Sequence, residues 1–411
     1  MNKNKSYKIK VLLVLVSLFL TFLCFEIFFR FVFFDSDTRS LGAKSVYDKV
    51  TNFSKSKHHA YCWGESSFHI HPYFGFVLDP TTACNENSTN KDGFKSPREF
   101  PLENPKDSFD ILVLGGSVAH NLAAGYNYYK PPWRNEIEEL LNKEYLVPEG
   151  TQFKIYNGSM PAGSLPLQTS VLITYLSSFD GVISIDGYNE MIGTKDMKLG
   201  APPIGTLTES MYSYLKVKRR FPFISTAHFL KKIDPLESSF LVAWVYRSLI
   251  SIGLKNKFKD LYNEDNFFFR IYKKPSEWSH KKLDQWNINR FVEFVKMEEA
   301  LCKRFNVKFA HFLQPNRFFY KELTSEEKSY VKFSREDFYK GLDQALSKER
   351  VQGLSTYSLL KVFENEKGTI YGDYIHSKQE ESGYSKGRDL ISQAIVKEIA
   401  QKWGLKKAPS L

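Results

Sequence analysis

A chain of 411 residues can hold one large domain or two of ordinary size. With 42% hydrophobic and 25% charged residues, its composition is globular and excludes general disorder. The formal net charge of +11 comes from lysines and arginines scattered along the chain, without zinc-finger spacing, an RNP-like motif or a basic helix, so we expect no nucleic-acid partner.

The N-terminal stretch predicts a membrane anchor. Residues 1–10 carry four lysines and no acidic residue, and residues 11–34 form the apolar run VLLVLVSLFLTFLCFEIFFRFVFF. About 20 apolar residues let a helix cross a bilayer, and this run is longer than the apolar part of a cleavable signal peptide. Because lysines stay in the cytoplasm, we expect the chain after residue 34 outside it, in the periplasm or on the cell surface. Glu26 and Arg30 lie one turn apart, where they can pair and snorkel.

Residues 35–105 are predicted to form an irregular segment next to the membrane, because polar clusters such as TTACNENSTNKDG fill them. Cys62 and Cys84 flank a loop-rich part of this segment, and in an oxidising compartment we expect them to form a disulfide. The four histidines between positions 58 and 71 have no acidic or cysteine partner at a convincing spacing, so we expect no metal site.

Strand and helix patterns alternate over residues 106–405. The apolar runs FDILVLG, FKIYN, GVISID and VKFAHFL are typical of parallel strands that are buried on both faces, and amphipathic helical patterns separate them. This alternation predicts a three-layer α/β/α sandwich around a mostly parallel sheet. The stretch near residues 195–285 is long and rich in basic and aromatic residues, and we expect it to form a helical insertion. Ligands of such sheets bind beyond the carboxyl ends of the strands.

Polar residues follow several of these strands. Ser117 comes after two glycines in ILVLGGSVAH and could be a helix cap or a nucleophile; the G-x-S-x-G elbow of α/β-hydrolases is absent. Asn189 in IDGYNE could cap a turn or donate to an oxyanion. Asp373 and His376 lie three apart in DYIH, where the carboxylate could orient the imidazole. Together these residue types meet the requirements of acyl transfer. His120 lacks a carboxylate partner, and we expect it to line the pocket.

Four of these motifs, in this order, resemble sequence blocks of the SGNH (GDSL-type) hydrolases. ILVLGGSVA resembles the first block and implies that Ser117 is the nucleophile and that its backbone N–H is one of the oxyanion donors. IYNGSMPAGS resembles the second block, whose glycine supplies an N–H to the oxyanion, here Gly163. VISIDGYNE resembles the third block and gives Asn189 as the side-chain oxyanion donor. DYIH resembles the fifth block and gives Asp373 and His376. An N-terminal anchor with an E…R pattern also resembles many bacterial members.

The resemblance covers roughly residues 105–405 without the insertion, and the chain departs from the family pattern in four places. Gly116 stands where the first block has an aspartate, and Val118 stands where it has a leucine. Glu190 replaces the aspartate that follows the asparagine of the third block. The spacing from Asn157 would put Ala162 rather than Gly163 at the glycine of the second block, and either residue can offer its backbone N–H.

The resemblance implies a flavodoxin-like fold, cleavage of an ester bond by a serine nucleophile, and no cofactor or metal. An anchored enzyme outside the cytoplasm reaches the cell envelope, so we expect an esterase acting on O-acyl groups, chiefly O-acetyl, of envelope polysaccharide or lipid. If a sugar hydroxyl replaces water, the same site is an O-acyltransferase. A third alternative is a non-catalytic envelope or glycan-assembly protein that keeps the fold, but the complete set of serine, asparagine, aspartate and histidine favours an enzyme.

Overall fold

The computed structural model describes residues 3–33, 68–71, 73–78, 89–104, 107–125, 134–148, 150–161, 163–195, 239–245, 248, 275–330, 335–380 and 383–409. The chain divides into two compact units, one of Met1–Ser67 with Ser210–Asn266 and one of Phe68–Glu209 with Phe267–Leu411. Cys62, Cys84 and most of the insertion expected near 195–285 lie outside the described residues.

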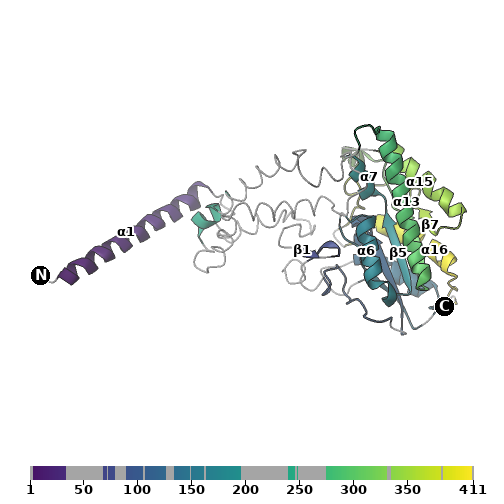
Figure 1. Cartoon of the computed structure of the whole chain (residues 1–411), viewed down its shortest axis with the longest axis horizontal. Helices are drawn as coiled ribbons and strands as arrows, with labels where there is room; N and C mark the ends of the chain where they lie inside the picture. Colours follow the sequence, from purple (N-terminus) through teal and green to yellow (C-terminus); the bar gives the residue numbers. More distant parts are fainter. Residues whose placement is uncertain are drawn as a thin grey trace. The chain divides into compact units, whose positions relative to one another are not determined.

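In the first unit the structure describes helix α1, Lys3–Val32, and a short helical segment at residues 240–245 (Figure 1). Among the residues that the structure describes, no helix combines the length and the apolar character that crossing a membrane requires. The anchor expected over residues 11–34 is not supported by this finding and stays a prediction from the sequence.

The carboxylate of Glu26 caps the helical segment at 240–245. It accepts hydrogen bonds from Oγ of Ser239 at 2.7 Å and from the N–H groups of Phe240 at 2.5 Å and Leu241 at 3.1 Å. The first N–H groups of a helix have no partner inside it and carry partial positive charge, so they bind a carboxylate well. The guanidinium of Arg30 lies 5.3 Å from the ring centre of Phe240. Glu26 therefore has partners in a distant segment, which the sequence did not suggest.

The second unit is built around a parallel sheet of five strands. They are β3 (Phe109–Gly115), β4 (Phe153–Asn157), β5 (Gly181–Asp186), β6 (Lys308–Leu313) and β7 (Thr356–Ser358). Their order across the sheet is β4-β3-β5-β6-β7, and every neighbouring pair is parallel. In chain order this is 2-1-3-4-5, the flavodoxin-like doubly wound arrangement. The prediction of an α/β fold with a mostly parallel sheet is confirmed.

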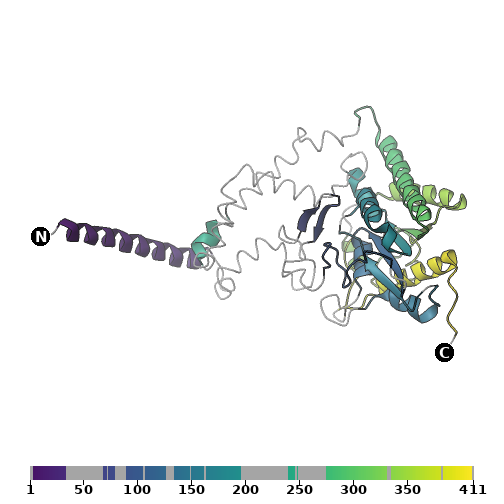
Figure 2. The same ribbon diagram turned by 60° about the horizontal axis from the view of Figure 1, so that its bottom comes forward.

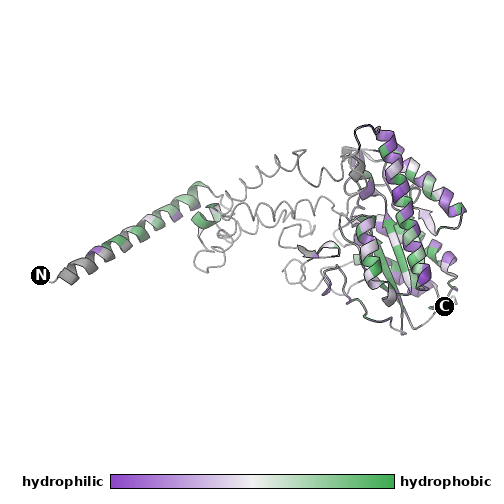
Figure 3. Cartoon of the chain, in the orientation of Figure 1, coloured by the Kyte–Doolittle hydropathy of each residue, from purple (hydrophilic) through white to green (hydrophobic). Residues whose placement is uncertain are grey.

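Helices cover both faces of the sheet. They are α4 (Ser117–Ala124), α5 (Glu136–Glu144), α6 (Leu165–Tyr175), α7 (Tyr188–Lys195), α13 (His280–Arg304), α14 (Ser325–Ser329), α15 (Glu336–Val351) and α16 (Lys386–Trp403). Helices α5 and α16 pack together, while α13 packs against α6, α15 and β6. Figure 2 shows α16 in yellow and α13 in green on opposite sides of the strands. Every residue of β3 and β5 is buried, and Figure 3 shows the strands in the apolar colour between helices of mixed colour.

Part of the segment expected next to the membrane belongs to this sheet unit. Strands β1 (Phe68–His71) and β2 (Gly75–Leu78) form an antiparallel hairpin. Further on, Phe100 packs on Tyr175 of α6 with ring centres 4.8 Å apart, and Arg98 pairs with Glu138 of α5 at 2.5 Å. Residues 89–104 therefore pack against helices from both faces of the sheet.

The strand order reverses at β3, and this places two candidate residues together. The chain leaves β3 toward β4 on one side and returns past it to β5 on the other. In doubly wound sheets the loops that leave the carboxyl ends of such neighbouring strands separate and open a crevice, where ligands bind. Ser117 directly follows β3 and Asn189 directly follows β5, so both lie at this crevice.

Candidate active site

The two glycines after β3 are needed for different reasons. Gly115 has φ +148°, and a Cβ there would lie within 3.0 Å of the carbonyl oxygen of Ile185 on β5. Gly116 has an extended backbone, φ −82° and ψ −154°, that any residue adopts, but a Cβ there would collide with Nδ2 of Asn189. Gly116 is also the N-cap of α4, so Ser117 is the first helical residue rather than the cap. The turn presents the serine at the positive end of the helix.

Ser117 lies within hydrogen-bonding distance of His376, although 259 positions separate them. Oγ of Ser117 is 2.7 Å from Nε2 of His376, and Nδ1 of His376 is 2.7 Å from Oδ2 of Asp373. Oδ1 of Asp373 accepts the N–H groups of Ile375 and His376 at 2.8 and 2.7 Å. Burial alone would raise the pKa of Asp373, but the imidazole and these N–H groups outweigh it and lower the pKa. The ionised carboxylate favours the imidazole proton on Nδ1, which leaves Nε2 to accept the serine proton.

A buried ion pair fixes the loop that carries Asp373 and His376. Oε1 of Glu327 in α14 accepts the N–H groups of Ile370 and Tyr371 at 2.8 and 3.0 Å, and Oε2 binds Nζ of Lys321 at 2.8 Å. Burial opposes the charge of Glu327, but Lys321 and the N–H donors lower its pKa to about 2. Sequence reasoning missed Glu327; the signal was its place in a T-x-x-E capping box with Thr324.

Two of the three expected oxyanion donors, Asn189 and Gly163, contact each other. Nδ2 of Asn189 donates to the carbonyl oxygen of Gly163 at 2.6 Å, and the N–H of Gly163 donates to the carbonyl oxygen of Met160 at 2.9 Å. The N–H of Gly163 was expected to bind the oxyanion, but it donates within its own loop. Gly163 instead contributes its carbonyl oxygen, which accepts from Asn189. Ala162 lies outside the described residues. An amide nitrogen carries two N–H groups, so Asn189 keeps one for an oxyanion, and the N–H of Ser117 has no partner within its helix.

Three carboxyl groups that sequence reasoning did not assign lie in the core beside these loops. Asp186 ends β5, Glu190 belongs to α7 and Glu298 belongs to α13. Burial raises the pKa of all three, Glu298 to about 8, and neighbouring carboxylates raise those of Asp186 and Glu298 further. The signal for Glu298 was its spacing from Val295 and Cys302, which puts it on the apolar stripe of a helix.

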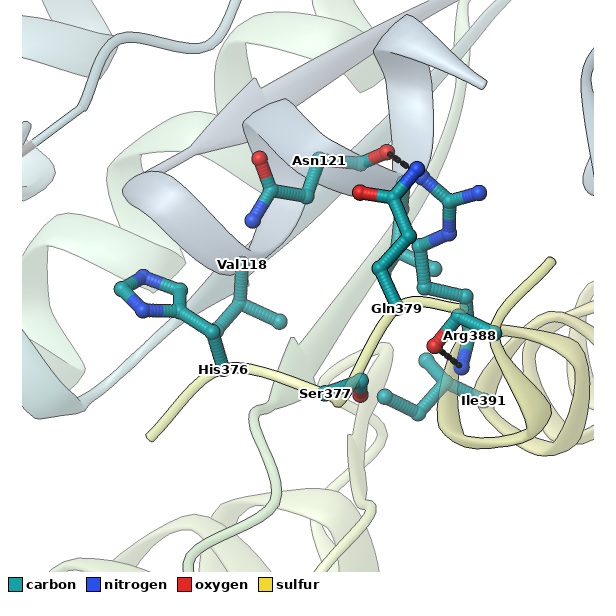
Figure 4. A pocket seen from close by; sticks show the side chains of 9 residues that line it. Val118, Asn121, His376, Ser377, Gln379, Arg388 and Ile391 are labelled. Atoms are coloured by element: carbon teal, nitrogen blue, oxygen red, sulfur yellow. Dashed lines mark hydrogen bonds between the residues drawn. The ribbon is translucent and has the colours of Figure 1, made fainter. Parts of the chain in front are cut away.

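A cavity of about 50 Å³ adjoins His376, between α4, the loop after His376 and the start of α16 (Figure 4). Its walls combine apolar side chains of Val118, Leu122 and Ile391 with polar ones of Asn121, Gln379 and Arg388. In Figure 4 the side chain of Asn121 lies between His376 and Arg388, whose guanidinium donates to carbonyl oxygens of Asn121 and Gly125 at 3.4 and 3.2 Å. Since a water molecule needs about 10–15 Å³ of such space, the cavity admits a group of only a few heavy atoms.

His120, the histidine that follows Ser117 by three positions, has a structural environment. His120 is 2% exposed, and its Nδ1 lies 3.2 Å from the carbonyl oxygen of Ser159. Burial, with a smaller effect of Lys95, lowers the pKa of His120 to about 3, and His120 is not among the residues that line the cavity. Within the described ranges, no group of three or more histidine, cysteine, aspartate or glutamate side chains is placed to hold a metal ion.

Comparisons with known proteins do not establish a family for this chain. No family model matches it, and no curated protein matches it. Among solved structures, it is similar to the lipase/acylhydrolase from Enterococcus faecalis, at 12% sequence identity and a TM-score of 0.31, over 73% of this chain and 99% of the other. A TM-score this low does not support conclusions about function, which must come from the geometry of the site.

The site combines three chemical elements. A serine hydroxyl contacts a histidine that an ionised aspartate orients, and the positive end of a helix lies at the same place. An asparagine amide reaches the same crevice from the neighbouring strand. Such a set can activate a nucleophile and stabilise the negative charge that its attack on a carbonyl creates.

Proposed function

We propose that this protein is a serine esterase of the SGNH type. The observation that carries the proposal is the pair of 2.7 Å contacts that joins Ser117 through His376 to Asp373. Oγ of Ser117 attacks the ester carbonyl carbon while its proton passes to Nε2 of His376, and Asp373 stabilises the resulting imidazolium. The N–H of Ser117 and the amide of Asn189 bind the oxyanion. The alcohol leaves with the proton from Nε2, and water then releases the acyl group by the same steps.

The proposed substrate is a short O-acyl ester, chiefly an O-acetyl group, on cell-envelope polysaccharide or lipid. The cavity of about 50 Å³ next to His376 supports a short acyl group, because it has room for a few heavy atoms beside the histidine. The protein would work outside the cytoplasm, attached to the membrane through residues 11–34. The exposed apolar side chains of α1, such as Phe19 and Phe31 at 65% and 61% exposure, favour this attachment. A reporter fused after Leu411 should be active only outside the cytoplasm, and cytoplasmic activity would exclude this topology.

The enzymatic proposal is tested with the full chain in detergent micelles and p-nitrophenyl esters of acetate, butyrate and octanoate. We expect kcat/KM to fall from acetate to octanoate, and an acetylated polysaccharide to release acetate. Ser117→Ala should abolish turnover without changing the unfolding temperature. The control is Ser170→Ala, whose hydroxyl donates to the carbonyl oxygen of Pro166 in the same helix at 3.1 Å. A folded wild-type protein that hydrolyses none of these esters would overturn the proposal, and preference for octanoate would overturn the short-acyl assignment.

A further inference from the structure

Glu190 joins the two loops that carry the oxyanion candidates. Its side chain lies in the core, with the residue 7% exposed. Oε1 accepts the N–H of Leu165 at 3.0 Å, and Oε2 accepts the N–H of Gly187 at 3.0 Å. Both oxygens of one carboxylate are thus used to bind backbone from two different crossovers of the fold.

Each of these N–H groups is close in the chain to an oxyanion candidate. Leu165 is the first residue of α6 and follows Gly163 by two positions. Gly187 precedes Asn189 by two positions and has φ +124°, a backbone conformation that L side chains rarely adopt. The direct bond from Asn189 to Gly163 and the two bonds of Glu190 therefore close one ring of contacts between the loops.

A carboxylate suits this place better than any neutral side chain. The N–H groups at the start of α6 carry partial positive charge, and a carboxylate offers two acceptors without a donor. Burial raises the pKa of Glu190, while the N–H groups of Leu165 and Gly187 oppose this by stabilising its charged form. Burial, and then neighbouring carboxylates, also raise the pKa values of Asp186 and Glu298. Asp186 faces Gln168 and Ser184, and Glu298 faces Thr169.

We propose that Glu190 is a positioning residue that sets the distance between the two oxyanion loops and thereby aims the amide of Asn189 at the substrate oxygen. This inference rests on the proposed esterase function. Glu190 does not touch the reacting atoms; it acts through Asn189. Without its two bonds, the contact from Asn189 to Gly163 would lose the support that Glu190 gives on both sides of it, and the amide would lose its fixed direction.

The test compares Glu190→Gln with wild type in p-nitrophenyl acetate hydrolysis. Glutamine keeps the shape, but its NH₂ faces one of the two backbone N–H groups and cannot accept from it. Because losing an oxyanion donor outright costs roughly 10²–10³ in kcat, we expect kcat to fall by about 10–100-fold and KM to stay within about threefold. Glu190→Asp, which is too short to reach both loops, should behave similarly and replaces the glutamine variant if that one fails to fold. The matched control is Glu298→Gln, which alters the same cluster but not these loops.

A double-variant cycle separates positioning from general support of the fold. If Glu190 acts through Asn189, Glu190→Gln should cost little more when Asn189→Ala is already present, whereas a merely structural role gives independent losses that multiply. Independent losses, or a folded Glu190→Gln protein with wild-type kcat, would overturn the inference while wild-type esterase activity persists. Failure of the proposed function is distinguishable, because wild type itself would then be inactive.

Discussion

Replacing Gly116 with alanine should disable the oxyanion site and leave the fold intact. The backbone there is extended, φ −82° and ψ −154°, so alanine meets no backbone strain. Its Cβ would lie within 3.0 Å of Nδ2 of Asn189 and 3.2 Å from the carbonyl oxygen of Gly163, whereas ordinary contacts begin at 3.4 Å. The asparagine amide is the end of a side chain and can give way, by on the order of 1 Å, a displacement that can cost about 100-fold in rate.

The expected size follows from this displacement. Complete loss of one oxyanion donor costs roughly 10²–10³ in kcat, so a displaced Asn189 should cost about 10²-fold, with KM within about threefold of wild type. Steady-state hydrolysis of p-nitrophenyl acetate measures both constants. Thermal unfolding provides the control, since we expect the midpoint to move by no more than about 3 °C.

The double variant Gly116→Ala/Asn189→Ala decides whether the collision is the cause. Once the amide of Asn189 is removed, the new Cβ keeps only the approach to the carbonyl oxygen of Gly163 at 3.2 Å, which a shift of a few tenths of an ångström relieves, so the double variant should match Asn189→Ala in kcat. A Gly116→Ala protein with wild-type kcat, or a double variant in which the two losses multiply, would refute the reasoning.

Three further outcomes are expected. His376→Ala should lower kcat by several orders of magnitude, and Asp373→Asn by up to about 10⁴-fold through loss of the correct tautomer; a folded His376→Ala protein with wild-type kcat/KM would end the catalytic assignment. Burial raises the pKa of Glu298 from 4.5 in the unfolded chain to about 8 in the folded one, so the stability that Glu298 contributes is complete below pH 4.5 and is lost as the pH rises toward 8. The unfolding temperature of Glu298→Gln should therefore fall less than that of wild type between pH 5 and 8. Equal falls in the two unfolding temperatures would contradict this. Mass spectrometry without reduction should find Cys62 linked to Cys84, and two free thiols would exclude the disulfide.

The sequence predicted those parts of the fold that local patterns determine. Strands β3 and β5 are apolar throughout because both their faces are buried, and this leaves a continuous apolar run that a single sequence displays. Asp373 and His376 were found because their contact is formed between residues three apart, within one turn of chain. Ser117 and Asn189 were found because each follows such a strand, where the chain reaches the binding edge of the sheet.

The remaining parts of the site depend on contacts between distant segments. The carboxylate of Glu190 accepts the N–H of Leu165 across 25 positions. Any residue except proline can donate its backbone N–H, so the side chain at position 165 does not reveal this bond. Spacing could not predict that the N–H of Gly163 turns to Met160, because this depends on the exact course of a loop. Residues 89–104 were expected outside the sheet unit because their composition is mainly polar. The few aromatic residues among them, such as Phe100, anchor the segment to the sheet unit.

In the proposed mechanism, the 259 positions between Ser117 and His376 make activity depend on synthesis that has passed the histidine. At about 5–20 residues per second, a ribosome needs roughly 10–50 s to reach the histidine after it has added the serine. During that time the hydroxyl has no base and is an ordinary alcohol, so a nascent chain cannot attack esters that it meets on its way. A message cut short anywhere between the two codons yields a chain whose serine is never activated.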